Sequence, residues 1–324
     1  MSSPSRRSLA VAAFALGLVS IHPVDTAAQA SPIRILVGFP AGGTIDIVAR
    51  SLAEKLRADL GAPVIVESRP GAGGQLAAVA LKQAAPDGRT LMIAPDHTMV
   101  IVPLTVKAPG FDPDKDFVPI GRIATYLGGF AVTSNNNAKT LAQFFDWTRA
   151  NPTQASVGIP SPGSIPQFAL AAIGMTANIK LTAVPYKGAA PLTQDLAAGH
   201  VPAGLSALGD FLPFHRDGKV RVLAVVDNRR SPLLPDVPTF TELGYSYDWK
   251  FWLGMFAPAM TPASIVDRTH AALQRALDAP DLREQMAKIF FDPAPGKPTE
   301  LTDQIRAGTR IWAPAIAASG WTPQ

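Results

Sequence analysis

The sequence contains no cysteine among its 324 residues. This absence excludes disulfide bonds, thiolate nucleophiles and metal sites with cysteine ligands. Apolar runs are also short, because after residue 30 none reaches the roughly 18 residues that a membrane-spanning helix needs. We therefore expect a protein that is not embedded in a membrane. Its stability should come from ordinary hydrophobic cores, for which a hydrophobic content of 47% is ample.

Several catalytic and metal-binding signatures are absent as well. The chain has neither HExxH nor GxxxxGKS/T, and GIPSPG at 158–163 is one residue too long for a G-x-S-x-G nucleophile elbow. The histidines after residue 30 have no metal-site spacing; they are His97, His200, His215 and His270. The basic residues form no stripe, although the net charge is +4. We expect a monomer with no metal, no cofactor and no nucleic-acid partner.

Residues 1–30 have the layout of an export signal. An arginine pair at 6–7 is followed by an apolar core at 9–21 and by AQA at 28–30, which fits a cleavage site with small residues. The apolar core is too short for a membrane anchor. We therefore predict a signal peptide that is cleaved after about Ala30 and an exported mature chain that begins at Ser31. The general and the twin-arginine export routes both remain open.

Strand-like and helix-like segments alternate along the rest of the chain. This alternation predicts an α/β protein with mostly parallel sheets that carry helices on both faces. The length predicts two domains. Strands are expected at 33–38, 63–67, 90–94, 120–126, 130–133, 155–159, 181–186, 201–206 and 220–226. Helices are expected at 47–60, 75–84, 141–150, 165–174, 192–198, 263–277 and 299–319.

The first strand meets a glycine-rich turn at residues 39–43, and a helical pattern follows directly. Thr44 is placed to cap this helix, and Asp46 lies in its first turn. Such a turn leaves backbone N–H groups at the positive end of a helix dipole, which suits an anion. Glycines here also serve simple close packing, so this loop alone leaves both interpretations open. Asp46 either complements the helix dipole or orients the loop, a water or a polar group of the ligand.

A similar construction occurs near residue 160, where an expected strand meets the turn PSPG at 160–163. Ser164 is expected to cap the helix that follows, with Gln167 as its capping-box partner. Neither loop contains an arginine or a lysine. We therefore expect the two loops to hold an anion through N–H groups, hydroxyls and helix starts, and not through ion pairs.

Two further groups of residues are candidates for chemistry. Asp96 and His97 follow a strand, at the edge of the sheet where α/β proteins bind ligands. Ser161 or Ser164 could act as a nucleophile only with a histidine nearby, and an exported serine hydrolase is the alternative that this leaves. Asp210 is an isolated acid for which we expect a solvated or capping role.

Seven motifs spread along the chain resemble those of the Bug family, the extracytoplasmic solute receptors of tripartite tricarboxylate transporters. Together the motifs are specific, and the resemblance covers essentially the whole chain after residue 30. The motifs are FPAGGTIDIVAR (39–50), RPGAGG (69–74), PDG (86–88), VPYKG (184–188), GKVRVLA (218–224), LPDVPT (234–239) and WLGMFAP (252–258).

The resemblance implies a two-domain periplasmic-binding-protein fold, type II-like, with two crossover segments and a ligand cleft between the domains. Domain 1 would comprise 31–131 and 257–324, and domain 2 would comprise 132–256. One ligand carboxylate would be held by the loops at 39–46 and 161–167. The candidate ligand-binding residues are Phe39, Ala41, Gly42, Gly43, Thr44, Asp46, Asp96, His97, Ser161, Pro162, Gly163, Ser164, Gln167, Tyr186, Gly188 and Ala207.

By resemblance the protein is not an enzyme. It would be a periplasmic receptor that captures a small organic acid and delivers it to the subunits of a membrane transporter. A receptor that signals to a sensor protein remains an alternative to transport. The sequence departs from the family at Gln167, where the family often has histidine, and at Pro202, where it often has aspartate. The first departure leaves the identity of the acid open.

Overall fold

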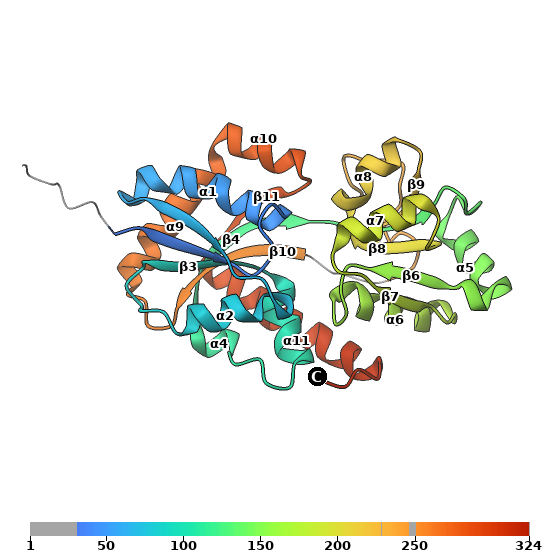
Figure 1. The fold of residues 1–324 in the computed structure, drawn as a ribbon, viewed down its shortest axis with the longest axis horizontal. Coiled ribbons are helices and arrows are strands. Elements are labelled where there is room, and N and C mark those ends of the chain that lie inside the picture. The colour runs from blue at the N-terminus through green and yellow to red at the C-terminus, as the bar shows by residue number, and fades with distance from the viewer. Residues whose placement is uncertain (1–30, 228, 246–250, 324) are drawn as a thin grey trace, which may run out of the picture.

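The computed structural model describes residues 31–227, 229–245 and 251–323, which form two lobes side by side (Figure 1). We call the part built on a six-stranded sheet the first lobe and the part built on a five-stranded sheet the second lobe. The predicted signal peptide lies outside the described residues. In the part of the chain that the structure describes, no helix is both long enough and apolar enough to cross a membrane.

The first lobe carries strands in the order β11-β4-β10-β3-β1-β2. Strands β1, β2 and β3 are parallel, whereas β10 runs antiparallel to β3 and β4, and β11 runs antiparallel to β4. The strand bounds are β1 Ile33–Val37, β2 Val64–Ser68, β3 Thr90–Pro95, β4 Phe117–Tyr126, β10 Phe251–Pro258 and β11 Asp292–Gly296.

Helices cover both faces of the first sheet (Figure 1). The helix bounds are α1 Thr44–Leu60, η1 Ala72–Gly74, α2 Gln75–Lys82, η2 His97–Ile101, α3 Val102–Thr105, α4 Pro113–Asp116, α9 Ala263–Asp278, α10 Pro280–Lys288 and α11 Pro298–Ala318. Successive residues of β1 point to opposite faces of the sheet, as the strand period requires. Ile35 packs into the core under α1, α9 and α10, and Leu36 packs into the core with α2 and α11.

The second lobe carries strands in the order β7-β6-β8-β5-β9, with β6 parallel to β7 and β8, and β5 antiparallel to β8 and β9. The bounds are β5 Gly128–Thr133, α5 Leu141–Ala150, η3 Pro152–Gln154, β6 Ser156–Ile159, α6 Ile165–Ala177, β7 Thr182–Pro185, α7 Ala189–Ala198, β8 Ala203–Ala207, α8 Leu208–Arg216 and β9 Val220–Val226. Each sheet thus has three parallel strands and then one antiparallel strand that enters from the other lobe, followed by β4 and β11 in the first sheet and by β9 in the second. This is the predicted two-domain architecture.

Three details differ from the sequence-based expectation. Only half of the first sheet is parallel, because β10 enters it from the opposite lobe and pairs antiparallel with β3 and β4, and β11 pairs antiparallel with β4. Strand β5 pairs in the second sheet over its whole length, although the expected division placed residues 128–131 in domain 1. Strand β10 pairs in the first sheet from Phe251, although residues 251–256 were expected in domain 2. By sheet membership, Gly128 therefore belongs to the second lobe and Phe251 to the first.

Strand directions place one set of loops of the first lobe at the junction between the lobes. Tyr126, the last residue of β4, pairs with Phe251, the first residue of β10, so both crossovers lie at one end of this sheet. Pro95 at the end of β3 pairs with Leu253 near the start of β10. Because β1 and β2 are parallel to β3, the loops that follow all three strands face the second lobe.

The second lobe mirrors this arrangement. Ala207 at the end of β8 pairs with Gly128 at the start of β5, directly after the crossover. Strands β6 and β7 are parallel to β8, so the loops that follow all three strands face the first lobe. Ligands of open α/β sheets bind beyond the carboxyl ends of the strands. The fold therefore brings two such edges face to face.

Candidate functional site

The loop after β1 forms a tight turn in front of α1. Gly42 has φ 80°, a left-handed conformation that favours glycine, and Gly43 is the extended residue that precedes the helix, with φ −72° and ψ 165°. Residues 40–43 are exposed and Phe39 is half-buried. The predicted cap was wrong by one residue, because Gly43 takes the N-cap position and Thr44 is the first helical residue.

Asp46 holds this loop in place. Its carboxylate accepts hydrogen bonds from the backbone N–H of Gly42 at 2.8 Å, from Arg50 at 2.8 and 3.1 Å, and from the Ser68 hydroxyl at 3.2 Å. The Arg50 guanidinium lowers the pKa of Asp46 against the opposing effect of burial, and the Gly42 N–H also lowers it. Of the two roles left open, the geometry favours loop orientation. The i, i+4 spacing of Asp46 and Arg50 is a sequence signal for this pair.

The loop after β6 has the same construction in front of α6. Gly163 has φ 64°, and Ser164 is the extended N-cap residue with φ −90° and ψ 157°. The backbone N–H of Gly163 donates to Oε1 of Gln167 at 2.8 Å. The predicted capping bond was wrong, because the buried Ser164 hydroxyl donates to the Ser161 carbonyl at 2.6 Å.

The two loops therefore match residue by residue. In each, a left-handed glycine precedes an extended N-cap residue, and the side chain four residues after that glycine accepts its N–H. The accepting side chain is the ionised Asp46 in the first lobe and the neutral Gln167 in the second. Among the described residues, no hydrogen bond or ion pair joins one loop to the other.

The loops differ in the donors that they leave for a ligand. The first N–H groups of a helix have no acceptor within the helix. In α1 these belong to Thr44, Ile45 and Asp46, whereas the first bond within the helix runs from Ile47 to Gly43. In α6 the second residue is a proline and the N–H of Gln167 donates to Ser164 at 2.9 Å. The helix start of the first lobe is thus the richer in donors.

Asp96 and His97 lie beside the second glycine turn of the first lobe. Asp96 is 5% exposed and accepts from the His97 backbone N–H at 2.9 Å. A Cβ added to Gly73 would come within 2.6 Å of Nε2 of His97, and the Thr98 hydroxyl donates to the Gly73 carbonyl at 2.8 Å. The structure thus places Asp96 and His97 at the junction edge, and the turn that contains Gly73 packs closely against His97 and Thr98.

Tyr186, Gly188 and Ala207 all lie at the junction edge of the second lobe. Gly188 donates its N–H to the Pro160 carbonyl at 2.8 Å, which ties the loop after β7 to the loop after β6. The Tyr186 hydroxyl donates to Asp195 at 2.9 Å, and burial followed by this carboxylate raises the pKa of Tyr186 to about 12. Ala207 is the last residue of β8.

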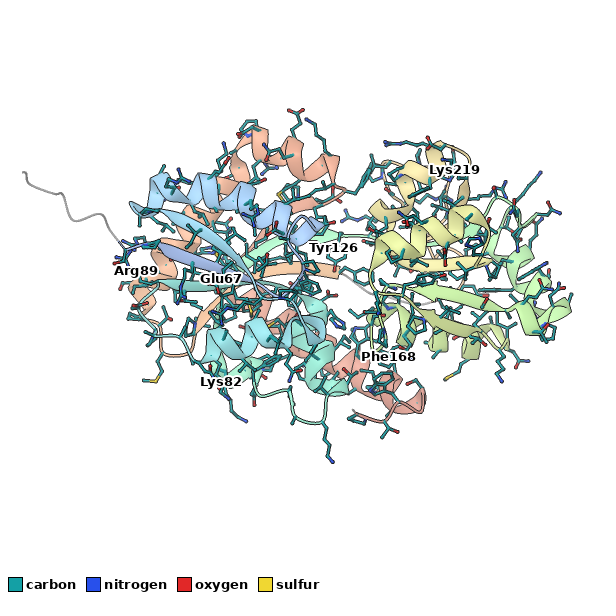
Figure 2. The ribbon with its side chains drawn as sticks, viewed as in Figure 1. Glu67, Lys82, Arg89, Tyr126, Phe168 and Lys219 are labelled. Atoms are coloured by element: carbon teal, nitrogen blue, oxygen red, sulfur yellow. The ribbon has the colours of Figure 1, made fainter. Side chains whose placement is uncertain are left out.

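Sequence reasoning missed a cluster at the crossover itself. The Tyr126 hydroxyl lies 3.4 Å from Asp96, and its ring stacks between Phe251 and Phe291. Asp210, expected to be solvated or capping, is half-buried in the first turn of α8, where it accepts from the Ser206 hydroxyl at 2.6 Å and the backbone N–H of the N-cap residue Ala207 lowers its pKa. Burial raises the pKa of Asp210 to about 6. Figure 2 places Tyr126 between the lobes.

The described residues supply little for a metal site or for a serine hydrolase. They contain no group of three or more histidine or acidic side chains arranged to hold a metal ion. Within the same residues, neither Ser161 nor Ser164 has a hydrogen bond to a histidine. A hollow of about 440 Å³ lies at the C-terminal end of α6, lined by residues 170–181. It is at the opposite end of that helix from the loop after β6.

Comparisons with known proteins agree with this geometry. The model of a family described as the tripartite tricarboxylate transporter family receptor matches residues 48–320. A Cupriavidus necator protein described as "UPF0065 protein in gbd 5'region" is 34% identical over 294 residues, which cover 89% of this chain and 88% of that protein.

Two solved structures extend the match to the whole fold. The periplasmic binding protein BugD is 29% identical, with a TM-score of 0.79 over 90% of this chain and 99% of BugD. An R. palustris protein solved with adipate is 28% identical, with a TM-score of 0.82 over 90% of this chain and 98% of that chain. The chain therefore belongs to the receptor family of the tripartite tricarboxylate transporters and has the fold of Bug-type solute-binding proteins.

Proposed function

We propose that this protein is a periplasmic receptor that binds a small organic acid between its lobes and passes it to a membrane transporter, without chemical turnover. The observation that carries this proposal is the matched pair of loops after β1 and β6. Each combines a left-handed glycine with a helix start, and the two face the junction from opposite lobes. A carboxylate is the ligand group that such helix starts suit.

The first lobe supplies the main grip on the carboxylate. The N–H groups of Thr44 and Ile45 stand at the start of a 17-residue helix, whose end carries about half a positive charge. Hydrogen bonds to a charged acceptor contribute about 1.5–3 kcal/mol each. Asp46 does not cancel this field, because its charge is paired with Arg50. The second lobe adds its own helix start and the half-buried Ser161.

The relatives support a carboxylate ligand and an extracytoplasmic site. One solved relative has adipate in its structure, and another is a periplasmic binding protein. Figure 1 shows the chain passing from β4 in the first lobe to β5 in the second. On this proposal the lobes close on the ligand by a hinge motion about the two crossovers, near Leu127 and Phe251.

A thermal-shift screen over mono-, di- and tricarboxylates and aromatic acids, adipate included, tests the proposal. An acid present at 100 times its Kd stabilises the native state by about 2.7 kcal/mol. Calorimetry then gives the affinity, and mass spectrometry should recover the acid unchanged. The absence of any stabilising acid, or conversion of the acid to a product, would contradict the proposal.

A matched pair of glycine substitutions locates the site. Gly42 and Gly61 have φ 80° and 66°, and a Cβ added at either meets no atom within 4 Å. Alanine at either position therefore introduces similar backbone strain, about 1–2 kcal/mol. Gly61 lies at the far end of α1. We expect Gly42→Ala to weaken binding at least tenfold and Gly61→Ala to leave it unchanged; equal affinities would remove the first loop from the site.

A further inference from the structure

The end of the chain reaches across the junction between the lobes. Helix α11 belongs to the first lobe, where Leu301, Ile305 and Trp312 are buried in the core. Gly320, with φ 74°, then turns the chain after the end of α11, and Trp321 is the next residue. Figure 1 shows the C-terminal end of α11, in red, beneath the second lobe near α6. The two helices are in contact.

Trp321 is anchored in one lobe and touches the other. Its Nε1 donates to the Thr105 carbonyl at 3.1 Å, at the end of α3 in the first lobe. Its ring packs edge-on against Phe168 of α6, with ring centroids 5.7 Å apart and an interplanar angle of 88°. Figure 2 shows Phe168 where the second lobe meets the end of the chain.

The same ring lies against the loop after β6. A Cβ added to Gly163 would sit 3.4 Å from Cζ2 and Cη2 of Trp321, which is ordinary van der Waals contact. Gly163 is the left-handed glycine of that loop, and its N–H is held by Gln167. The loop therefore packs against Trp321, a side chain anchored in the first lobe. Phe168, which contacts the same Trp321 ring, lies in the first turn of α6, the helix that follows the loop.

We propose that Trp321 is a positioning residue, which holds the loop at Ser161–Ser164 and the start of α6 in the conformation that completes the ligand site. The expected effect on ligand binding rests on the proposed function, in which the loop after β6 and the loop after β1 together hold the carboxylate. The anchor on Thr105 fixes the ring relative to the first lobe. The loop is thus placed by the opposite lobe as well as by its own strand and helix.

A second aromatic contact between the lobes provides a control. Phe290, which follows α10 in the first lobe, packs on α8 of the second. A Cβ added to Gly209 would lie 2.7 Å from this ring, and the Arg216 guanidinium lies 5.9 Å from its centroid. Neither contact involves the loop after β6. Phe290→Ala therefore removes an aromatic bridge between the lobes without touching that loop.

Hydrogen exchange of the ligand-free full chain, followed by mass spectrometry, tests the role of Trp321. We expect Trp321→Ala to raise exchange in residues 160–168 at least fivefold and Trp321→Phe to restore part of the protection, since it keeps a ring but loses the bond to Thr105. Phe290→Ala should leave exchange in 160–168 as in the wild type. Unchanged exchange in Trp321→Ala, or an equal rise in Phe290→Ala, would overturn the proposal.

Calorimetry with adipate as the probe adds a readout that a purely structural role would not move. Trp321→Ala should weaken adipate binding about tenfold, with Trp321→Phe between it and the wild type. Thermal unfolding of both variants measures how much stability each loses. For a given loss of stability, Phe290→Ala should bind adipate more tightly than Trp321→Ala. An equal loss of affinity in the two variants would overturn the proposal. If adipate does not bind the wild-type protein, adipate is not its ligand, whereas the exchange pattern still decides the role of Trp321.

Discussion

Replacing Asp96 by asparagine should change how the stability of the protein depends on pH. Asp96 is 5% exposed, and the Tyr126 hydroxyl and the His97 N–H are its hydrogen-bond partners. Among the described residues, no arginine or lysine pairs with it. Burial raises the pKa of Asp96 to about 8, and the two hydrogen bonds oppose this rise only in part. Asparagine has nearly the same shape, keeps the acceptor oxygen and cannot ionise.

The direction of the pH dependence is set by the pH values at which the unfolded and the native protein lose the Asp96 proton. The unfolded chain releases this proton near pH 4, and the native protein keeps it until about pH 8. Between these values the native state binds more protons than the unfolded state, so the free energy of unfolding falls as pH rises. The slope is about 1.4 kcal/mol for each pH unit and comes to about 5 kcal/mol over the whole interval as an upper limit.

Urea unfolding at pH 5.5 and pH 7.5 measures the effect inside this interval. The stability of Asp96→Asn relative to the wild type should rise by about 2–3 kcal/mol between the two pH values. The contribution of Asp210, whose pKa is also raised, is common to both proteins and cancels in the difference. Asp217→Asn, an exposed substitution at the end of α8, is the control and should follow the wild type. If Asp96→Asn also ran parallel to the wild type, Asp96 would not keep its proton in the native state.

Three other outcomes are expected. Asp46→Ala should cost about 1–3 kcal/mol in chemical denaturation at pH 7, because it leaves the Gly42 N–H and the Ser68 hydroxyl without their charged acceptor; the cost should shrink below pH 4, since Asp46 has a lowered pKa and its contribution is lost as it protonates. Ser164→Ala should cost about 1 kcal/mol through the lost bond to Ser161, and a larger loss would contradict the observed local geometry. Calorimetry between 50 and 500 mM salt should show ligand affinity changing less than threefold, because the loops offer the ligand N–H groups and hydroxyls and contain no arginine or lysine; a tenfold loss would point to a cationic site elsewhere.

Local sequence patterns predicted the helix starts well, because a helix start is determined by residues that are close together in the sequence. Helix α5 begins at Leu141 as expected, and the Thr140 hydroxyl accepts from the Gln143 N–H at 3.2 Å. At α1 the glycine pair misled the expectation, because a left-handed Gly42 moves the cap to Gly43. Helix α8 was missed altogether, since it follows β8 without a loop and contains Pro213.

The candidate site could be predicted only in its local parts. The two loops stand out in the sequence because glycine, strand and helix signals lie within a few residues of each other. The contact between Trp321 and Gly163 joins positions 158 residues apart, and no local pattern marks such a pair. The same holds for the Ser68 bond to Asp46, which needs β1 and β2 to be paired before the two side chains can meet.

The exchange of strands between the lobes has a consequence for how the chain acquires its structure. All five strands of the second sheet lie within residues 128–226, so that sheet can close as soon as this continuous segment is available. The first sheet cannot, because β10 separates β3 from β4 and lies more than 120 residues after β4 in the chain. Until β10 arrives, β3 and β4 each present an unpaired edge, which is an aggregation hazard. A chain that is released N-terminus first would therefore complete the sheet of its second lobe first. The sheet of the first lobe would stay incomplete until β10 is available to pair between β3 and β4.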